Sequence, residues 1–410
     1  MSQIDIAVLG HGVVGSGVAE ILLSHEENIE KKAKTKINIK YILDLKDFPG
    51  LSYSDKFIKD FDIILGDDSV KVVAEVMGGL HPAYEFVKAC LENKKSVVTS
   101  NKELVAAFGA ELLKIAADNN VNFLFEASVG GGIPVLRPIA QCLAANDLYE
   151  VVGILNGTTN FILTKMFKEG MQFDDALKLA QQLGYAEREP SADIDGHDAC
   201  RKICILSSIS FGKHVYPNQV STEGIRKITA SDVEFADSFG CVIKLVGHSK
   251  LMEDGRISAA VYPALISKES QLAGVDDVFN AIMVRGDSVG DVMFYGRGAG
   301  KLPTASAVVA DVIDCVKHLN TRKYLFWEDG SKEYVVDANS VKERFYIRGN
   351  AVEGAKDEIA KVFGDVIYLS KSNKDNEIAF ITSVDLQGNL LNKLKKLTLL
   401  KNAVVLHVMK

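Results

Sequence analysis

The chain has 410 residues, of which 47% are hydrophobic and 25% are charged, with a formal net charge of −7. This length exceeds what one hydrophobic core organises, so two or three domains are expected. The weakly acidic balance, without a basic stripe, argues against nucleic acid as a partner. Because no apolar run is long enough to span a bilayer and no signal-peptide pattern opens the chain, we expect a cytoplasmic protein without a membrane partner.

The first third of the chain alternates predicted strands and helices. Strands are predicted at Ile4–Leu9, Ile37–Leu43, Val72–Val76, Ser96–Thr99 and Asn122–Glu126. Helices are predicted over Val13–Ser24, Pro82–Asn93 and Lys102–Asn119, with a polar insertion at Glu26–Thr35. This βαβα rhythm predicts an α/β domain of Rossmann type, a doubly wound parallel sheet with helices on both faces.

The middle of the chain has an α+β pattern. Helices are predicted at Phe161–Glu169, Phe173–Leu183, Gly196–Phe211 and Ala230–Phe239, and strands at Val151–Leu155, Ile243–His248 and Ile257–Pro263. The glycine-rich segment Gly296–Pro303 precedes a strong helix, Thr304–His318, which we expect to return to the first domain.

The last part of the chain follows a polar stretch, Trp327–Asn339, that has the composition of a linker. Beyond it the order is strand, helix, strand, strand, helix, strand, at Arg344–Arg348, Ala355–Phe363, Val366–Leu369, Ile378–Ser383, Leu390–Leu397 and Val404–Val408. That order is ferredoxin-like. The predicted domains are 1–137 with the returning helix 304–320, then 138–303, then 340–410.

A glycine-rich turn connects the first predicted strand to the first helix. Its G-x-G-x-x-G pattern is formed by Gly10, Gly12 and Gly15, with Val13 and Val14 opening the helix. Glycines at this position allow a tight turn and let a pyrophosphate approach the helix N-terminus. The context therefore predicts a dinucleotide site rather than a fortuitous glycine turn, with His11 as a spacer.

The choice between NAD and NADP depends on the end of the second strand. A carboxylate there, Asp44, would bind the adenosine ribose and repel a 2′-phosphate, which favours NAD. NADP stays open, because Lys46 is close enough in sequence to serve a phosphate.

Two segments follow later strands of the same sheet. Lys102 begins a helix at the carboxyl end of a strand, where its ammonium opposes the helix dipole, so a ligand-facing role is favoured. Glu126–Pro134 presents backbone carbonyls beside one carboxylate, which suits a hard cation, although a flexible domain crossing explains it equally well.

Acidic residues gather around one lysine between Gly184 and Lys202. The carboxylates within Gly184–Glu187 and Asp193–Lys202 are Glu187, Asp193, Asp195 and Asp198. On a helix that starts near Asp195, Asp198 and Lys202 share a face with Leu206 and Ile209. An exposed i,i+4 ion pair is the simpler explanation, but so many acids around one lysine suit a small zwitterion with an ammonium and a hydroxyl group.

Taken together, these segments resemble homoserine dehydrogenases over nearly the whole chain. The matching pieces are Gly10–Gly15, Glu75–Gly79, Thr99–Lys102, Glu126–Pro134, Leu155–Asn160, Gly184–Lys202 and Gly298–Ala307. The resemblance implies NAD(P)-dependent interconversion of L-homoserine and L-aspartate 4-semialdehyde, on the route to threonine, methionine and isoleucine. It also implies a substrate and dimerisation domain, often a C-terminal ACT regulatory domain, and a homodimer or homotetramer.

The resemblance also assigns roles to individual residues. Lys202 would give and take the proton at the substrate oxygen, with Lys102 close to the nicotinamide and Asp198 orienting Lys202. Glu187 would bind the substrate ammonium. The other implied substrate residues are Asp193, Asn156 and Thr158, and a monovalent cation, Na⁺ or K⁺, would be held largely by backbone oxygens of Glu126, Val129, Gly131 and Ile133.

The chain departs from the family mainly in its last domain. Asn350–Lys356 lacks the usual proline and has its glycine displaced, and Leu369–Glu377 is a polar run. Earlier, Ser100 and Cys200 replace residues that are mostly alanine in the family. We therefore expect an ACT-like domain that supports assembly, with threonine inhibition absent or feeble.

Two other functions fit parts of the sequence. The same scaffold could serve a dehydrogenase of another amino-acid semialdehyde. A non-catalytic sensor of dinucleotide or amino acid is the second alternative, but it predicts loss of Lys102 or Lys202, and both are present.

Overall fold

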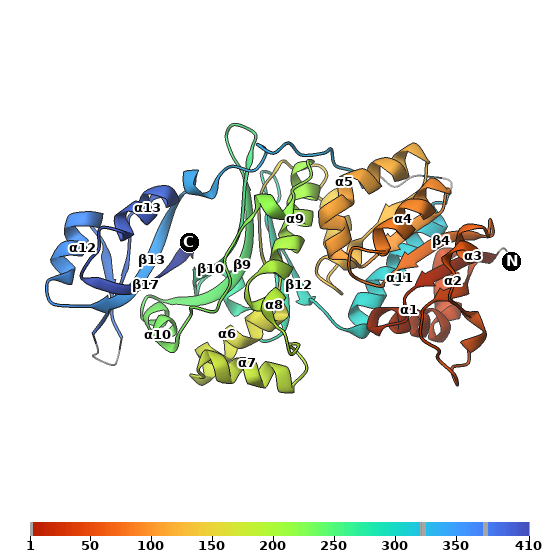
Figure 1. Ribbon diagram of the computed structural model, residues 1–410. Helices are drawn as coiled ribbons and strands as arrows, with labels where there is room; N and C mark the ends of the chain where they lie inside the picture. The colour runs from red at the N-terminus through yellow and green to blue at the C-terminus, as the bar shows by residue number, and fades with distance from the viewer. Residues whose placement is uncertain (1–2, 320, 322–324, 372–375, 410) are drawn as a thin grey trace. The chain divides into compact units, whose positions relative to one another are not determined.

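The protein was analysed as a computed structural model, which describes residues 3–319, 321, 325–371 and 376–409. The chain forms two compact units (Figure 1). The first unit comprises residues 1–148, 204–217 and 285–330, and the second comprises 149–203, 218–284 and 331–410. No helix in the described ranges is long and apolar enough to cross a membrane.

The first unit is built on a parallel sheet with the order β3-β2-β1-β4-β5-β6. These strands are β1 Gln3–Leu9, β2 Lys36–Leu43, β3 Phe57–Ile58, β4 Val70–Glu75, β5 Ser96–Thr99 and β6 Phe123–Leu124. The order reverses direction between β1 and β4, so the predicted doubly wound sheet is confirmed. Ligands of such sheets bind beyond the carboxyl ends of the strands at this switch point.

The helices of the first unit cover this sheet. They are α1 Val13–Ser24, α2 Glu26–Ala33, α3 Phe61–Leu65, α4 Ala83–Glu92, α5 Lys102–Asp118 and α11 Lys301–Lys317, and the unit also contains β12, Gly290–Arg297. The predicted return of the late helix is confirmed, because α11 packs against α1 and its apolar residues join the core around β1 (Figure 1). The predicted polar insertion instead forms α2, because Ile29 and Ala33 lie one turn apart and are both buried.

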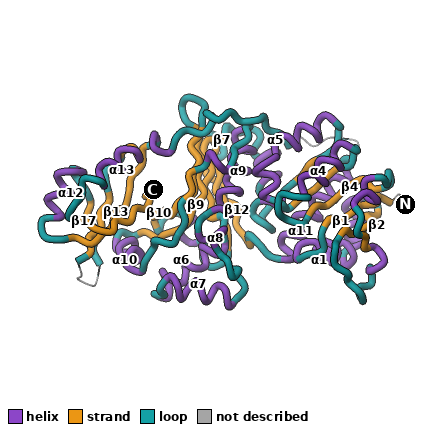
Figure 2. Tube along the Cα trace, in the orientation of Figure 1, coloured by secondary structure: helices purple, strands orange, loops and turns teal. Residues whose placement is uncertain are grey.

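The second unit contains a mixed sheet in which β11-β7-β9-β10-β17-β13-β15-β14 are successive neighbours. Strands are drawn in orange in Figure 2. The strands are β7 Leu148–Ile154, β8 Ser221–Thr222, β9 Cys241–Leu251, β10 Ile257–Ser267, β11 Phe279–Gly286, β13 Lys342–Ala351, β14 Ile367–Leu369, β15 Glu377–Ile381, β16 Asp385–Leu386 and β17 Leu400–Met409. The helices are α6 Gly157–Glu169, α7 Phe173–Gln182, α8 Ser191–Ile194, α9 His197–Phe211, α10 Ala230–Ser238, α12 Ala355–Phe363 and α13 Gln387–Leu394. Of α9, the residues up to Ile203 belong to this unit.

The C-terminal part has the predicted ferredoxin-like order. Its strands lie as β17-β13-β15-β14, with antiparallel neighbours, and α12 and α13 cover a core that includes Phe345, Ile359 and Phe380. β17 also pairs in parallel with β10, with Ala264 opposite His407, so this part continues the sheet of the second unit. The predicted domain boundaries therefore stay a prediction, and part of the polar run, residues 372–375, lies outside the described residues.

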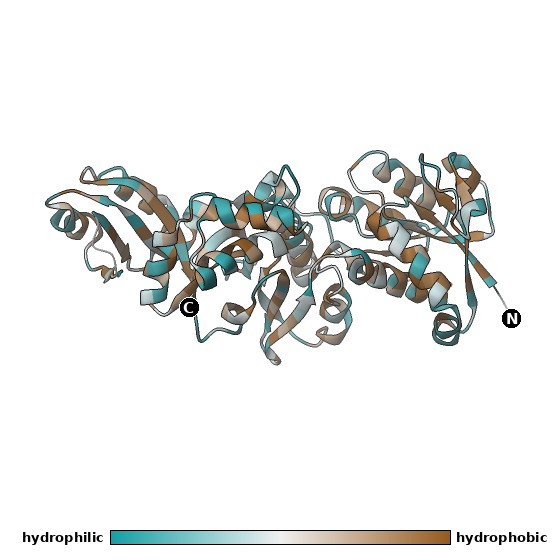
Figure 3. Cartoon of the chain, turned by 90° about the horizontal axis from the view of Figure 1, so that it is seen from below, coloured by the Kyte–Doolittle hydropathy of each residue, from teal (hydrophilic) through white to brown (hydrophobic). Residues whose placement is uncertain are grey.

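Apolar side chains account for this arrangement. Hydrophobic residues lie along the strands of both units, whereas hydrophilic residues are frequent on the outer helices (Figure 3). The stretch predicted as a polar linker is not simply solvated, because Trp327 is only 1% exposed in the first unit. In the second unit, Val335 bridges to Ile257 of β10. Scattered apolar residues thus anchor a segment whose average composition is polar.

Candidate active site

The glycine-rich turn lies between β1 and α1, as predicted. Gly10 has a φ of +95°, and its backbone N–H donates to the carbonyl of Leu43 at 2.8 Å. A Cβ atom on Gly15 would lie 2.0 Å from the Gly10 carbonyl oxygen, which only glycine avoids. The turn therefore brings backbone to the N-terminus of α1, where a pyrophosphate is bound in folds of this kind.

Asp44 follows β2 and is held against this turn. Its Oδ2 atom accepts from the backbone N–H of His11 at 2.8 Å, and its Oδ1 atom accepts from the N–H of Lys46 at 2.9 Å. The predicted placement of a carboxylate beside the glycine turn is therefore observed. The backbone N–H of Lys46, and not its ammonium, makes the contact to Asp44.

His11 anchors the turn, a role that the sequence interpretation missed. Its ring is buried against Phe48, Tyr53 and Phe57, with Nε2 3.1 Å from the Tyr53 hydroxyl. Burial lowers the pKa of His11, although the charge of Asp44 opposes this. The signal in the sequence was the run of aromatic residues shortly after Asp44.

Lys102 is positioned by polar residues at the ends of β4 and β5. The buried carboxylate of Glu75 accepts from the N–H of Met77 at 2.8 Å and from the Thr99 hydroxyl at 2.5 Å. Asn101 caps α5 by accepting from the N–H of Leu104 at 3.1 Å. Lys102 is thus the first residue of α5, at the carboxyl edge of the sheet, as predicted.

In the loop predicted to bind a cation, the Glu126 carboxylate binds backbone N–H groups. Glu126 accepts from three successive backbone N–H groups, those of Val135, Leu136 and Arg137, at 2.6 to 2.8 Å. Its own N–H donates to Asp311, which pairs with Arg137 at 2.5 Å. No cluster of His, Cys, Asp or Glu suited to a metal occurs among the described residues. Backbone carbonyls would therefore have to supply the ligands of a cation here.

Asp311, beneath this loop, is a buried acid that the sequence interpretation did not single out. Burial raises the pKa of Asp311 to about 7, the charge of Glu126 adds to this, and Arg137 opposes it. Its partners come from segments far away in the chain, so no local pattern indicated it.

Lys202 and Asp198 form a buried ion pair in the second unit. Nζ of Lys202 lies 2.7 Å from Oδ2 of Asp198, and it also donates to the Leu155 carbonyl at 2.7 Å. The two residues are 7% and 5% exposed, which rules out the exposed i,i+4 pair. The single apolar face predicted for this helix is not what buries the lysine, since α9 is buried on all sides from Lys202 to Ser208.

Asn156 joins this pair to a second acid, Asp193. Its Nδ2 atom donates to Oδ2 of Asp198 at 2.9 Å and to Oδ1 of Asp193 at 2.7 Å. Its Oδ1 atom caps α6 by accepting from the N–H of Thr159 at 2.9 Å. The structure therefore brings four of the predicted site residues together.

Asp195 does not belong to this cluster, contrary to the predicted grouping. Its carboxylate pairs with Arg226 at 2.5 Å, and this hydrogen bond lowers its pKa. The predicted helix is continuous, but it begins at His197 and so excludes Asp195, because Gly196 takes a left-handed φ of +86° between α8 and α9. That turn directs Asp195 away from the helix that carries Lys202.

Glu187 lies in an exposed segment of the second unit. No cation among the described residues pairs with its carboxylate, so it is accessible to a ligand. The hydroxyl of Thr158, in the first turn of α6, donates to the Tyr185 carbonyl at 2.6 Å. Thr158 thus ties the segment that carries Glu187 to the helix that begins beside Asn156.

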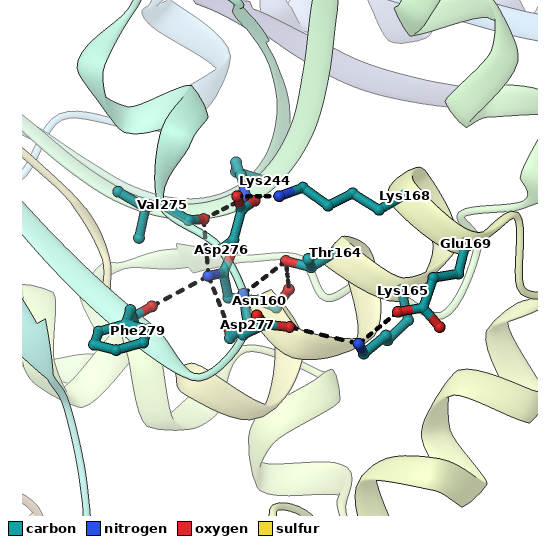
Figure 4. A network of polar contacts seen from close by, with 10 residues as sticks. All are labelled: Asn160, Thr164, Lys165, Lys168, Glu169, Lys244, Val275, Asp276, Asp277 and Phe279. Atoms are coloured by element: carbon teal, nitrogen blue, oxygen red, sulfur yellow. Dashed lines mark hydrogen bonds and ion pairs between the residues drawn. The ribbon is translucent and has the colours of Figure 1, made fainter.

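A second polar network fixes α6 one turn further on (Figure 4). The Asn160 amide donates to the carbonyls of Val275, Asp277 and Phe279 at 3.0 to 3.1 Å. The buried Lys244 donates to Asn160 Oδ1 at 3.1 Å and to the Val275 carbonyl at 2.5 Å. Burial lowers the pKa of Lys244 to about 8. The sequence did not indicate Lys244, because its partners come from distant segments.

A doubly wound parallel sheet with a glycine turn and a carboxylate after β2 defines a nicotinamide-dinucleotide-dependent oxidoreductase, with an acid–lysine cluster in its second unit. Family models agree with this class: that of the homoserine dehydrogenase NAD-binding domain matches residues 10–126, and that of homoserine dehydrogenase matches residues 134–313. The chain belongs to the homoserine dehydrogenase family.

Individual relatives support the same assignment. The chain is 44% identical over 317 residues to a homoserine dehydrogenase of Synechocystis sp., covering 76% of this chain and 73% of that protein. A homoserine dehydrogenase structure from Thiobacillus denitrificans superposes with a TM-score of 0.90 at 33% identity, covering 100% of this chain and 99% of the other. One from S. aureus gives 0.83 at 36% identity, with the same coverage.

The family establishes the reaction class. The protein is an oxidoreductase that interconverts L-homoserine and L-aspartate 4-semialdehyde, a step of amino-acid biosynthesis, with a nicotinamide dinucleotide. The predicted enzyme class is thereby confirmed, and the two alternative functions gain no support.

Proposed function

We propose that Lys202 is the catalytic residue that exchanges the proton of the substrate hydroxyl. The observation that carries this proposal is the buried Lys202–Asp198 pair, with its 2.7 Å contact. A nicotinamide dinucleotide held at the glycine turn that begins at Gly10 would supply the hydride chemistry at the C4 carbinol. As the hydride leaves, the hydroxyl proton must also leave, and the uncharged amine of a lysine is the group to take it. In the reverse direction the lysine ammonium returns the proton to the carbonyl oxygen.

Asp198 orients this lysine, and Lys102 serves beside the nicotinamide. The Asp198 carboxylate favours the charged form of Lys202, whereas burial favours the neutral form. Lys102 opens α5 at the edge of the sheet where the cofactor of such folds lies. The test is steady-state oxidation of L-homoserine by the wild type and by a Lys202 variant, followed by the absorbance of the reduced nicotinamide.

Two acidic residues serve the positively charged ammonium group of the substrate. Glu187, an exposed carboxylate without a described partner, binds the substrate ammonium. Asp193 supports it as a half-buried acid near Asn156. Thr158 and Asn156, at the start of α6, support these acids: Thr158 fixes the segment of Glu187, and Asn156 donates to Asp193.

NAD is the favoured cofactor. Gly10, Gly12, Val13, Val14 and Gly15 receive the pyrophosphate at the N-terminus of α1. Asp44 is held beside that turn, where a carboxylate binds a ribose hydroxyl and repels a 2′-phosphate. NADP is the second candidate, since the structure of an archaeal homoserine dehydrogenase mutant, 28% identical with a TM-score of 0.64, is a complex with NADPH.

A monovalent cation, Na⁺ or K⁺, is held by backbone carbonyls of Glu126, Val129, Gly131 and Ile133. The left-handed Gly131 turns this loop sharply, and a Cβ atom there would lie 2.4 Å from the Gly298 carbonyl oxygen. The Glu126 carboxylate is committed to backbone N–H groups, so its role is to shape the loop. Oxygen ligands of this kind suit a hard cation.

The chain has three functional domains: a dinucleotide domain, 1–137 with 304–320, a substrate domain, 138–303, and an ACT-like domain, 340–410. The protein assembles as a homodimer or homotetramer. The ferredoxin-like order supports the ACT-like assignment. Exposed apolar side chains on β12, Met293 and Tyr295, favour assembly, because they are 37% and 51% exposed. Light scattering of the purified protein measures its oligomeric state directly.

A further inference from the structure

The amide of Asn156 is fixed in one orientation. Its Oδ1 atom accepts from the backbone N–H of Thr159 at 2.9 Å, so this atom must be the oxygen. The opposite atom is therefore the NH₂ group, whose two protons go to Asp198 and Asp193. Asn156 is buried, and its side chain has no spare proton with which to bind a substrate.

The same amide controls the surroundings of the lysine. Oδ2 of Asp198 accepts from Asn156 and from Lys202 at the same time, and the carbonyl of Leu155, the preceding residue, accepts from Lys202. Two consecutive residues thus hold both the lysine and its partner. The amide also lies between the carboxylates of Asp193 and Asp198, which would otherwise repel each other.

We propose that Asn156 is a positioning residue that bridges Asp193 and Asp198 and thereby orients Lys202 for proton transfer. This inference rests on the proposed role of Lys202 and replaces the expectation that the Asn156 side chain binds substrate. Without the amide, Asp198 loses a neutral donor and attracts the lysine proton more strongly, so the lysine gives up that proton only at higher pH.

Among the described residues, the acids that the amide contacts and the lysine that shares one of them come from two helices. Asp198 and Lys202 are on α9, and Asp193 is on α8. Substitution of Asn156 therefore acts on these three groups. Asn156→Ser keeps an oxygen that can cap α6 and removes the bridge. Asn156→Asp also keeps the cap, but it places a third carboxylate between the other two.

Asn160 offers a matched control on the same helix. It is also a buried asparagine, but its amide binds the loop 275–279 and Lys244 instead of the acids (Figure 4). Asn160→Ser should lower the melting temperature and leave the pH profile of kcat in place. A general weakening of α6 is therefore separable from a change at the lysine.

The test is the pH profile of kcat for L-homoserine oxidation. We expect Asn156→Ser to lower kcat at neutral pH by about 10–100-fold. The acid limb of the profile should move to higher pH, further for Asn156→Asp, with KM changed little. A raised KM with an unmoved profile would instead make Asn156 a substrate ligand, and a response equal to that of Asn160→Ser would make its role structural.

The proposed function is tested separately by Lys202→Ala. If this variant is inactive while Asn156→Ser keeps the wild-type profile, only the inference about Asn156 is overturned. If Lys202→Ala retains normal activity, the proposed role of Lys202 fails. Should Asn156→Ser not fold, Asn156→Asp, which retains the helix cap, decides by the same profile.

Discussion

The ammonium of Lys202 shares one carboxylate oxygen of Asp198 with the amide of Asn156, at 2.7 and 2.9 Å respectively. This relationship makes the lysine the buried cation of an otherwise acidic cluster. Lys202→Ala should therefore lower kcat by about 10²–10⁴-fold, because the proton of the substrate hydroxyl then has no positioned acceptor. Lys244→Met, which removes another buried lysine of the second unit, is the control and should keep kcat near normal. Near-normal kcat of Lys202→Ala would contradict the mechanism.

Glu187→Gln should act mainly on KM. Loss of a charge-assisted contact to the substrate ammonium, about 1.5–3 kcal/mol, corresponds to a rise in KM of roughly 10–150-fold. Glu189→Gln changes a neighbouring exposed acid that bonds to Ser191 and should leave KM unchanged. The role of Glu187 would be refuted if the variant lost as much activity on 1,4-butanediol, which has no amino group.

Asp44 should set the preference for NAD over NADP in kcat/KM. Asp44→Ser removes the charge that repels a 2′-phosphate, so the preference should narrow by roughly tenfold. Asp47→Ser, at an exposed acid that pairs with Lys59, is the matched control. If the wild type prefers NADP tenfold or more in kcat/KM, Asp44 does not bind the ribose hydroxyl.

L-threonine, titrated to about 10 mM, should inhibit weakly or not at all. The charged groups on one face of the C-terminal sheet are already committed, since Arg348 pairs with the buried Asp232 at 2.6 Å and Lys371 pairs with Glu377 at 2.6 Å. An amino acid would have to displace one buried pair and one partly buried pair, which is costly. D-threonine controls for unspecific effects, and strong inhibition by the L form alone would overturn this expectation.

Lowering the pH should lower the stability of the first unit, because His214 is buried there in its neutral form. Its Nδ1 atom accepts from the indole N–H of Trp327 at 2.9 Å and its Nε2 atom faces the Ala106 carbonyl, so the ring is neutral. Burial lowers the pKa of His214. The folded state then binds fewer protons than the unfolded state, and stability falls as the pH drops below about 6.5. The fluorescence of the single tryptophan reports this transition.

The control for this prediction is His214→Gln, which keeps a side chain able to accept and donate but cannot be protonated. Its melting temperature should fall less than that of the wild type between pH 7 and pH 5. Equal falls in the two proteins would show that another group governs the acid response.

Local patterns in the sequence were sufficient to predict the doubly wound parallel sheet and the nucleotide turn, but not the order of the strands. Strand and helix periods, together with the spacing of Gly10, Gly12 and Gly15, depend on neighbours in the chain, and the structure confirmed them. The pairing of Asp198 with Lys202 could also be predicted from the sequence, because side chains four residues apart on a helix lie on the same side.

The composition of the cluster around Lys202 was decided only by the tertiary structure. Asn156 lies 37 and 42 positions from the two acids that it bridges, and Lys244 lies 84 positions from Asn160. Asp195 is adjacent to the cluster in sequence, but Arg226 holds it elsewhere. Periodicity describes the face on which a side chain lies, whereas the partner it meets depends on how distant segments pack, and no local pattern encodes that.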